Sequence, residues 1–145
     1  MQIETLSNAN LKNLTQLVLE LWPDCDFAEE YNHYKDIIDK ENEICYLAKE
    51  QNDYIAFVHL SLRNDYVEGA SSYPIAYAEG LYVKPGYRKK GIGKQLLSIG
   101  QQWAKQKGCK EFASDAQLDN QPSIQFHKQV GFNETNRVVC FIKKL

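Results

Sequence analysis

The strongest constraint on the fold is a run of three elements between Ile75 and Gly108. The segment from Ile75 to Val83 is rich in β-branched and aromatic residues and is followed by Pro85-Gly86, as is typical of a strand. A basic loop with two glycines comes next. Apolar residues then recur at helical spacing up to Gly108, namely Ile92, Leu96, Leu97, Trp103 and Ala104. The sequence therefore predicts a strand, a glycine loop and a helix in succession.

The remaining elements predict one domain of mixed α/β architecture. Upstream we expect a strand, two helices and a hairpin: Ile3 to Leu6, a helix from a cap at Ser7 or Asn8 to Trp22, a second helix with Tyr31, Tyr34, Ile37 and Ile38 on one face, then strands at Ile44 to Lys49 and Tyr54 to Leu62. Downstream we expect a strand at Phe112 and Ala113, a helix from Asn120 to Val130 and a last strand from Val138 to Ile142. This order predicts a single domain over residues 1–145 with a mixed, partly antiparallel sheet flanked by helices.

Composition excludes several classes of protein. A length of 145 residues, 43% of them hydrophobic, suffices for one core. The net charge of −2 argues against a general affinity for nucleic acid. The start of the chain lacks a signal-peptide pattern and no run is long enough to span a bilayer, so we expect a cytoplasmic protein without membrane partners. The four cysteines are scattered without ligand spacing, so neither a metal site nor a disulfide framework is expected.

The loop between the strand and the helix has the chemistry of a phosphate site. Glycines allow close backbone approach, and free amides at a helix N-terminus point toward anions. The basic residues concentrated here suit a pyrophosphate: Lys84, Arg88, Lys89, Lys90 and Lys94. Neither the P-loop pattern nor the dinucleotide fingerprint fits, because Leu96 stands where the latter needs its third glycine. The alternative interpretation is a solvated run of charges.

The string from Glu79 to Lys94, EGLYVKPGYRKKGIGK, resembles the acetyl-coenzyme A signature of the GNAT superfamily, a strand followed by R/Q-x-x-G-x-G/A at the start of a helix. The segment from Phe126 to Phe132 resembles the second cofactor motif of that family. The resemblance implies a GNAT-like fold, acetyl-coenzyme A as acetyl donor and no metal. It implies that the following residues bind the cofactor's thioester, phosphates and arm: Leu81, Tyr82, Val83, Arg88, Lys89, Lys90, Gly91, Ile92, Gly93, Lys94 and Asn120.

Two residues are candidates for moving protons. Glu79 shares strand parity with Tyr77, Leu81 and Val83, so we expect desolvation to raise its pKa toward that of a useful general base. The alternative is an exposed strand carboxylate. His127 stands where most GNAT members carry a tyrosine, and is our candidate for returning a proton to the thiolate. The alternative is a hydrogen-bonded helix histidine without a catalytic role.

Acidic and aromatic residues near strand and helix ends indicate a cationic acceptor. Asp115 follows a strand at the end where open α/β sheets bind ligands, although an N-cap role explains it equally. Acidic Asp65 and Glu68 lie in the loop before Ile75. Trp22 and Tyr66 are able to stack on a sugar or a cation, with core packing as the alternative for Trp22.

Several segments resemble the short aminoglycoside 6′-N-acetyltransferases over nearly the whole chain: Leu21 to Pro23, Arg63 to Gly69, Glu79-Gly80, Ala113 to Asp115 and Asn133 to Val138. The resemblance implies an aminosugar antibiotic as acceptor, with its 6′-amine acetylated and resistance as the outcome. It implies an acceptor site lined by Trp22, Tyr66, Glu79 and Asp115. It also implies a homodimer in which the region around Asn136 approaches the partner's site, although an acidic residue is expected at that position.

The expected mechanism is direct transfer within a ternary complex, with backbone donors stabilising the oxyanion and no covalent enzyme intermediate. Two other functions stay open. One is a GNAT enzyme that acetylates a protein N-terminus, a lysine or a polyamine. The other is a non-catalytic protein that binds acyl-coenzyme A or a drug. Thiol release in the presence of different amines discriminates among them.

Overall fold

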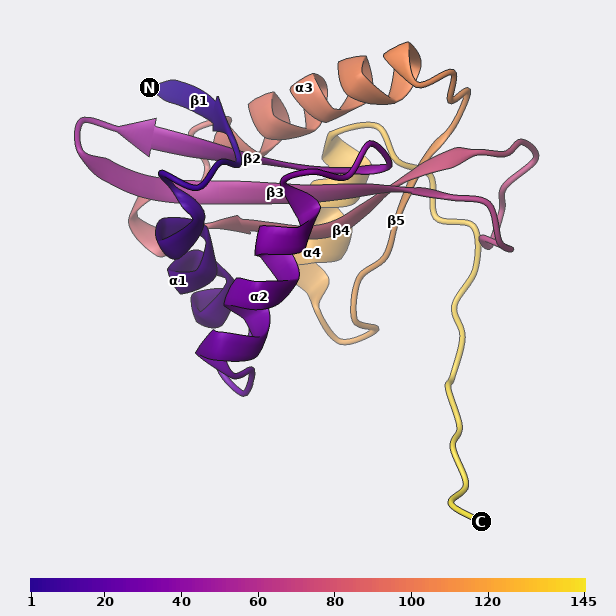
Figure 1. Cartoon of the computed structure of the whole chain (residues 1–145). Helices are drawn as coiled ribbons and strands as arrows, with labels where there is room; N and C mark the ends of the chain where they lie inside the picture. Colours follow the sequence, from indigo (N-terminus) through magenta and orange to yellow (C-terminus); the bar gives the residue numbers. More distant parts are fainter.

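A computed structural model describes residues 1–145 as one sheet with helices on both faces (Figure 1). The elements in chain order are β1 (Gln2–Thr5), α1 (Leu11–Leu21), α2 (Phe27–Ile37), β2 (Glu43–Glu50), β3 (Asp53–Arg63), β4 (Ile75–Val83), the 3₁₀ turn η1 (Pro85–Tyr87), α3 (Ile92–Gln106), β5 (Phe112–Ser114) and α4 (Gln121–Gln129). No helix is long and apolar enough to cross a membrane.

The sheet has the mixed topology expected from the sequence. Its strands lie in chain order, β1 to β5. The first four strands are antiparallel neighbours, while β5 runs parallel to β4. A parallel neighbour requires a crossover, which α3 supplies between β4 and β5. The strand, glycine loop and helix predicted from Ile75 onward are therefore confirmed.

Each face of the sheet has its own core. On one face α1 and α2 pack against a buried cluster that includes Leu47, Phe57 and Tyr82. On the other face α3, joined by Phe126 of α4, packs against Val58, Leu60 and their neighbours. The long strand β3 contributes to both cores because its side chains alternate between the two faces. Figure 1 shows α1 and α2 on one side of the strands and α3 on the other.

The first two helices begin in different ways, and the start of α1 differs from the expectation. Asp26 caps α2 by accepting a hydrogen bond from the Glu29 amide, as an N-cap aspartate does. The first helix begins after Asn10 rather than at Ser7 or Asn8. The Asn10 side chain accepts from the Ser7 amide and donates to the Thr5 carbonyl, so it braces the turn between β1 and α1 instead of capping the helix.

The predicted last strand, Val138 to Ile142, is wrong for the single chain. The residues after α4 form no regular structure and run away from the sheet as an extended tail (Figure 1). A strand exists only when another strand pairs with it, and no strand of this chain pairs with the tail. Its apolar side chains are exposed to solvent, and Phe141 and Ile142 are more than 90% exposed.

Candidate active site

A β-bulge in β4 defines the centre of the site. His59 of β3 pairs with Gly80, while the next residue, Leu60, pairs with Ala78, so Glu79 is an extra residue in β4. The extra residue breaks the alternation of side chains. Tyr77 and Tyr82 pack on the face with α1 and α2, and Leu81 on the opposite face. The predicted shared parity of Glu79 with Leu81 and Val83 is therefore wrong, because alternation holds only in an unbulged strand.

Beyond the bulge, the outer edge of β4 has no strand beside it. The pairing of β4 with β5 ends at Ala78. The Lys84 amide donates to Ile55 of β3, so by antiparallel alternation the backbone groups of Tyr82 also face β3. The N–H and C=O groups of Leu81 and Val83 consequently point outward. Arg88 occupies one of them, since its Nε donates to the Val83 carbonyl at 2.7 Å.

The loop after β4 presents a series of free amides at the start of α3. The backbone N–H groups of residues 89–94 have no backbone acceptor, and the first amide bonded within the helix is that of Gln95, to Gly91. Lys89 and Gly91 both have positive φ, at 62° and 82°, which turns successive amides toward one side. Lys90 and Lys94 are exposed at this loop. The arrangement fits an anionic group of several phosphates.

The two glycines of this loop serve different purposes. Gly91 needs its positive φ, which L side chains rarely adopt, and open space surrounds it. Gly93 is buried, and a Cβ there would stand 3.1 Å from the Phe126 ring of α4. Gly93 therefore lets α3 pack closely on α4, which brings the second motif beside the loop. Sequence reasoning assigned both glycines to cofactor approach alone.

The second motif supplies Asn120 and His127. Asn120 is the N-cap of α4 and accepts a hydrogen bond from the Ser123 amide, which leaves its amide nitrogen free. His127 Nδ1 lies 2.6 Å from the Ser123 carbonyl, so Nδ1 carries the proton and donates. Its Nε2 then accepts from the Ser114 hydroxyl at 2.8 Å. The hydrogen-bonded helix histidine is thus what the free chain shows, with Nε2 facing the end of β5.

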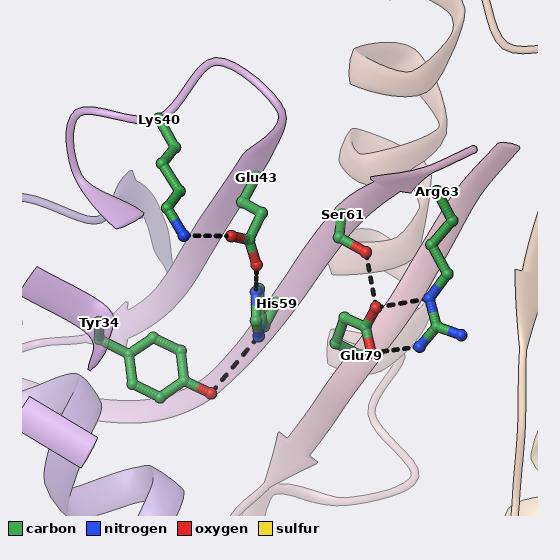
Figure 2. Close-up of polar contacts among 7 residues, drawn as sticks. All are labelled: Tyr34, Lys40, Glu43, His59, Ser61, Arg63 and Glu79. Carbon is green, nitrogen blue, oxygen red and sulfur yellow. Dashed lines mark hydrogen bonds and ion pairs between the residues drawn. The ribbon is translucent and has the colours of Figure 1, made fainter. Parts of the chain in front are cut away.

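Glu79 lies within a polar cluster on the face with α1 and α2 (Figure 2). Its Oε1 accepts from Ser61 Oγ at 2.6 Å and from Arg63 Nε at 2.9 Å. Its Oε2 accepts from Arg63 Nη2 at 2.8 Å. Burial alone raises the pKa of Glu79, but the hydrogen bonds and charge of Arg63, with the bond from Ser61, together lower it below its usual value. The predicted rise in the pKa is wrong because Arg63 was not foreseen as its partner.

Asp115 joins the same cluster through Tyr77. The Tyr77 hydroxyl donates to the Asp115 carboxylate, and the Arg63 guanidinium lies 3.5 Å from the centre of the Tyr77 ring. Asp115 is exposed and no helix begins there, so the N-cap alternative is wrong. Two carboxylates, Glu79 and Asp115, are thereby connected through Arg63 and Tyr77.

Trp22 and Tyr66 lie in two further places. Trp22 ends α1, and its ring lies against Gly80 at the bulge. Tyr66 is 77% exposed in the loop between β3 and β4, and its hydroxyl donates to Glu68 at 2.6 Å. Asn136 of the tail donates to the other oxygen of Glu68 at 2.8 Å. Glu68 therefore brings Tyr66 and Asn136 together. From the sequence, Glu68 was expected only as one of two acidic residues in this loop. The other, Asp65, is exposed.

Sequence reasoning missed a row of polar residues along β3. His59, Ser61 and Arg63 alternate with Leu60 and Leu62, and all three turn toward the same face. His59 is buried, lies 2.9 Å from Glu43 and contacts the Tyr34 hydroxyl at 3.5 Å (Figure 2). Burial lowers the pKa of His59 despite the bond to Glu43. The polar alternation in an otherwise apolar strand was the signal that would have found them.

No group of three or more acidic, histidine or cysteine side chains is arranged to hold a metal, and all four cysteines are free. The polar groups that the site brings together are backbone donors, carboxylates, the Arg63 guanidinium and His127.

The family model described as the acetyltransferase (GNAT) family matches residues 8–132. An aminoglycoside N(6′)-acetyltransferase type 1 of Acinetobacter haemolyticus is 37% identical over all of this chain and 99% of its own length. The protein of the same name from Acinetobacter baumannii is 38% identical, with the same coverage of both chains.

Solved structures agree with these relatives. The structure of AAC(6′)-Iy, in complex with a bisubstrate analogue that joins coenzyme A to monomethyl-acetylneamine, has a TM-score of 0.95 and 32% identity over 99% of this chain and 98% of its own. The aminoglycoside 6′-N-acetyltransferase AAC(6′)-IG from Acinetobacter haemolyticus has a TM-score of 0.93 and 36% identity over 100% and 99%.

Proposed function

Because this chain belongs to the GNAT acetyltransferase family, we propose that it transfers the acetyl group of acetyl-coenzyme A to the 6′-amine of an aminoglycoside and so confers resistance. The observation that carries the proposal is that relatives over the full length have this activity in their names and that solved structures of enzymes with such names have the same fold. In this chain that fold brings Glu79, Asp115 and Trp22 together around the bulge. Thiol release from acetyl-coenzyme A in the presence of kanamycin tests it.

The cofactor lies across the start of α3 and along the outer edge of β4. The free amides of residues 89–94, with Arg88 and the nearby lysines, hold its phosphates. The outward N–H and C=O groups of Leu81 and the N–H group of Val83 pair with the amides of the pantetheine, while the Val83 carbonyl stays bonded to Arg88. The backbone of Tyr82 faces β3 and its side chain lies in the core, so Tyr82 does not bind the cofactor as predicted from the sequence. The amide nitrogen of Asn120 is free to contact the cofactor's arm.

The acceptor lies on the face with α1 and α2. A polycationic aminosugar needs carboxylates for its ammonium groups and an apolar surface for its rings. Asp115 is an exposed carboxylate there, and Trp22 offers a partly exposed ring at the bulge. Tyr66, with Glu68 and Asn136, forms the outer rim of the site.

The amine attacks the thioester carbonyl carbon, the carbon–sulfur bond breaks, and the proton of the amine leaves for a base. Outward N–H groups on β4 donate hydrogen bonds to the oxyanion that forms during the attack. Glu79 is our candidate for drawing off the proton. Its lowered pKa keeps it ionised at neutral pH, so it is always present as an acceptor.

The departing thiolate takes a proton from His127. In this role His127 carries protons on both ring nitrogens: Nδ1 keeps its bond to the Ser123 carbonyl and Nε2 donates to the Ser114 hydroxyl. That hydroxyl turns and gives its own proton to the thiolate, and His127 is left neutral. Loss of the basic limb of the kcat profile in a His127→Phe variant is the expected signature of this role.

The protein forms a homodimer through its tail. The supporting observation is the series of exposed apolar side chains after α4, which a second copy would cover: Val138, Val139, Phe141, Ile142 and Leu145. Asn136 lies just before this tail and is bonded to Glu68 of its own chain. We propose that in the dimer the region around Asn136 also approaches the partner's acceptor site. We further propose that residues 1–145 act as a single domain in the cytoplasm, where acetyl-coenzyme A is supplied.

A further inference from the structure

We infer that Arg63 is a positioning residue, whose guanidinium fixes the Glu79 carboxylate so that one acceptor position, on Oε2, is left for the attacking amine. The inference rests on the proposed function, since it takes the face around Glu79 as the acceptor site. Nothing in the cofactor motif or in the acceptor residues predicted from sequence includes Arg63.

The hydrogen bonds of Glu79 fill all but one of the acceptor positions of its carboxylate. A carboxylate oxygen has about two lone-pair positions. Ser61 and Arg63 Nε fill both positions on Oε1, and Arg63 Nη2 fills one of those on Oε2. The position that stays free is therefore defined in direction by the guanidinium. An amine that donates a proton there has its nitrogen held in one place relative to β4.

Arg63 is itself held in place. Its guanidinium stacks on the Tyr77 ring at 3.5 Å, and the Tyr77 hydroxyl is bonded to Asp115. Planar stacking together with a two-point bond to a carboxylate fixes both the position and the tilt of a guanidinium, which an ammonium does not match. One cation thereby orders Glu79 directly and orders Asp115 through Tyr77.

The charges around Glu79 indicate that this carboxylate places the amine rather than attracting the polycationic acceptor. The groups near Glu79 are Ser61, Arg63 and His59 on β3 and Tyr77 on β4. Asp115 lies behind Tyr77, to which it is bonded, and Tyr34 of α2 and Glu43 of β2 lie behind His59. The Arg63 cation offsets the charge of Glu79, while exposed Asp115 has no cation of its own. Attraction of the polycation therefore falls to Asp115, and placement of the amine to Glu79.

The test compares Arg63→Met, which keeps the length of the side chain, with Arg63→Lys, which keeps the charge but loses the two-point bond. We expect Arg63→Met to lower kcat at least tenfold while the KM for kanamycin changes less than threefold. Arg63→Lys should recover only part of kcat. The double variant Arg63→Met with Glu79→Gln should have a kcat no lower than that of Glu79→Gln alone. The reason is that each change removes the same bonded arrangement of Arg63 and Glu79. A kcat within twofold of the wild type in Arg63→Met, or effects that multiply in the double variant, would overturn the inference.

A second readout does not depend on turnover. In protein labelled with ¹³C at the glutamate carboxyl, the Glu79 signal is identified by its loss in Glu79→Gln. Its pKa should lie below the ordinary value in the wild type and rise in Arg63→Met, since burial then acts without the opposing guanidinium. An unchanged pKa contradicts the role of Arg63 even if kanamycin is no substrate. If the wild type releases no thiol but the pKa of Glu79 rises in Arg63→Met as expected, the result contradicts the proposed function and leaves the role of Arg63 standing.

Discussion

The Trp22 ring lies so close to Gly80 that a Cβ on the glycine would stand 2.8 Å from Cη2 of the ring. Gly80 follows the extra residue of the bulge, and Trp22 ends α1, so this contact joins the first helix to the reactive part of β4. The indole has its present position only because residue 80 has no side chain.

Gly80→Ala is therefore expected to displace the Trp22 ring and to raise the KM for an aminoglycoside several-fold. The proposed cofactor site lies on the outer edge of β4 and at α3, so the Kd of coenzyme A should stay unchanged. Gly86→Ala is the matched control, because no atom lies within 4 Å of the Cβ position there. Equal KM values for the two variants would show that the contact between Trp22 and Gly80 has no part in acceptor binding.

Gly91→Val tests the loop at the start of α3. A β-branched residue at a φ of 82° is strained, and relief of the strain reorients the amides that face the phosphates. We expect the Kd of coenzyme A, measured by calorimetry, to rise more than tenfold. Gly86→Val controls for the added bulk. Unchanged cofactor binding in folded Gly91→Val protein would show that the phosphates do not bind at this loop.

Asp115→Ala should raise the KM for kanamycin about ten- to a hundredfold, the effect of losing a charged hydrogen bond of about 1.5–3 kcal/mol. Tyr66→Ala should act in the same direction, and both variants should bind coenzyme A normally. Asp36→Ala, on the exposed side of α2, removes the same charge at a distance and should be neutral. Added salt should raise the wild-type KM, because it screens the attraction. A KM insensitive to salt would exclude charge as a main part of recognition.

The elements around the cofactor were predictable because their signals are local. The glycines, the basic residues and the helical spacing from Ile92 to Gly108 lie within one short stretch, and the structure has them as expected. The bulge at Glu79 was not predictable, since it depends on how β4 pairs with β3. The bond from Arg63 to Glu79 joins residues on two strands, and therefore the sign of the pKa change was missed.

The last strand was mispredicted for a related reason. The continuous apolar run from Val138 to Ile142 indicates a segment that is able to pair, but it does not say with which chain. Within one chain the tail has no neighbour, and its side chains are exposed. We therefore expect this segment to form a strand only in the proposed dimer, where a second chain pairs with it.

Deletion of residues 138–145 is expected to convert a dimer into a monomer. The deletion removes the apolar side chains whose burial would drive association, at roughly 25 cal/mol per Å² covered. Sedimentation of the full chain and of the shortened chain at equal concentration measures the effect. Phe141→Lys combined with Ile142→Lys keeps the length and should act in the same way. A monomeric full chain, or a shortened chain that is still dimeric, would contradict assembly through the tail.

The most direct test of the central claim is thiol release from acetyl-coenzyme A with kanamycin, followed by location of the new acetyl group in the product. We expect turnover with kanamycin, acetylation at the 6′-nitrogen, and no turnover with an aminoglycoside that carries a hydroxyl in place of the 6′-amine. Turnover with a protein N-terminus, lysine or polyamine but not with kanamycin would contradict the proposed acceptor. Cofactor and drug binding without any thiol release would contradict the enzyme itself.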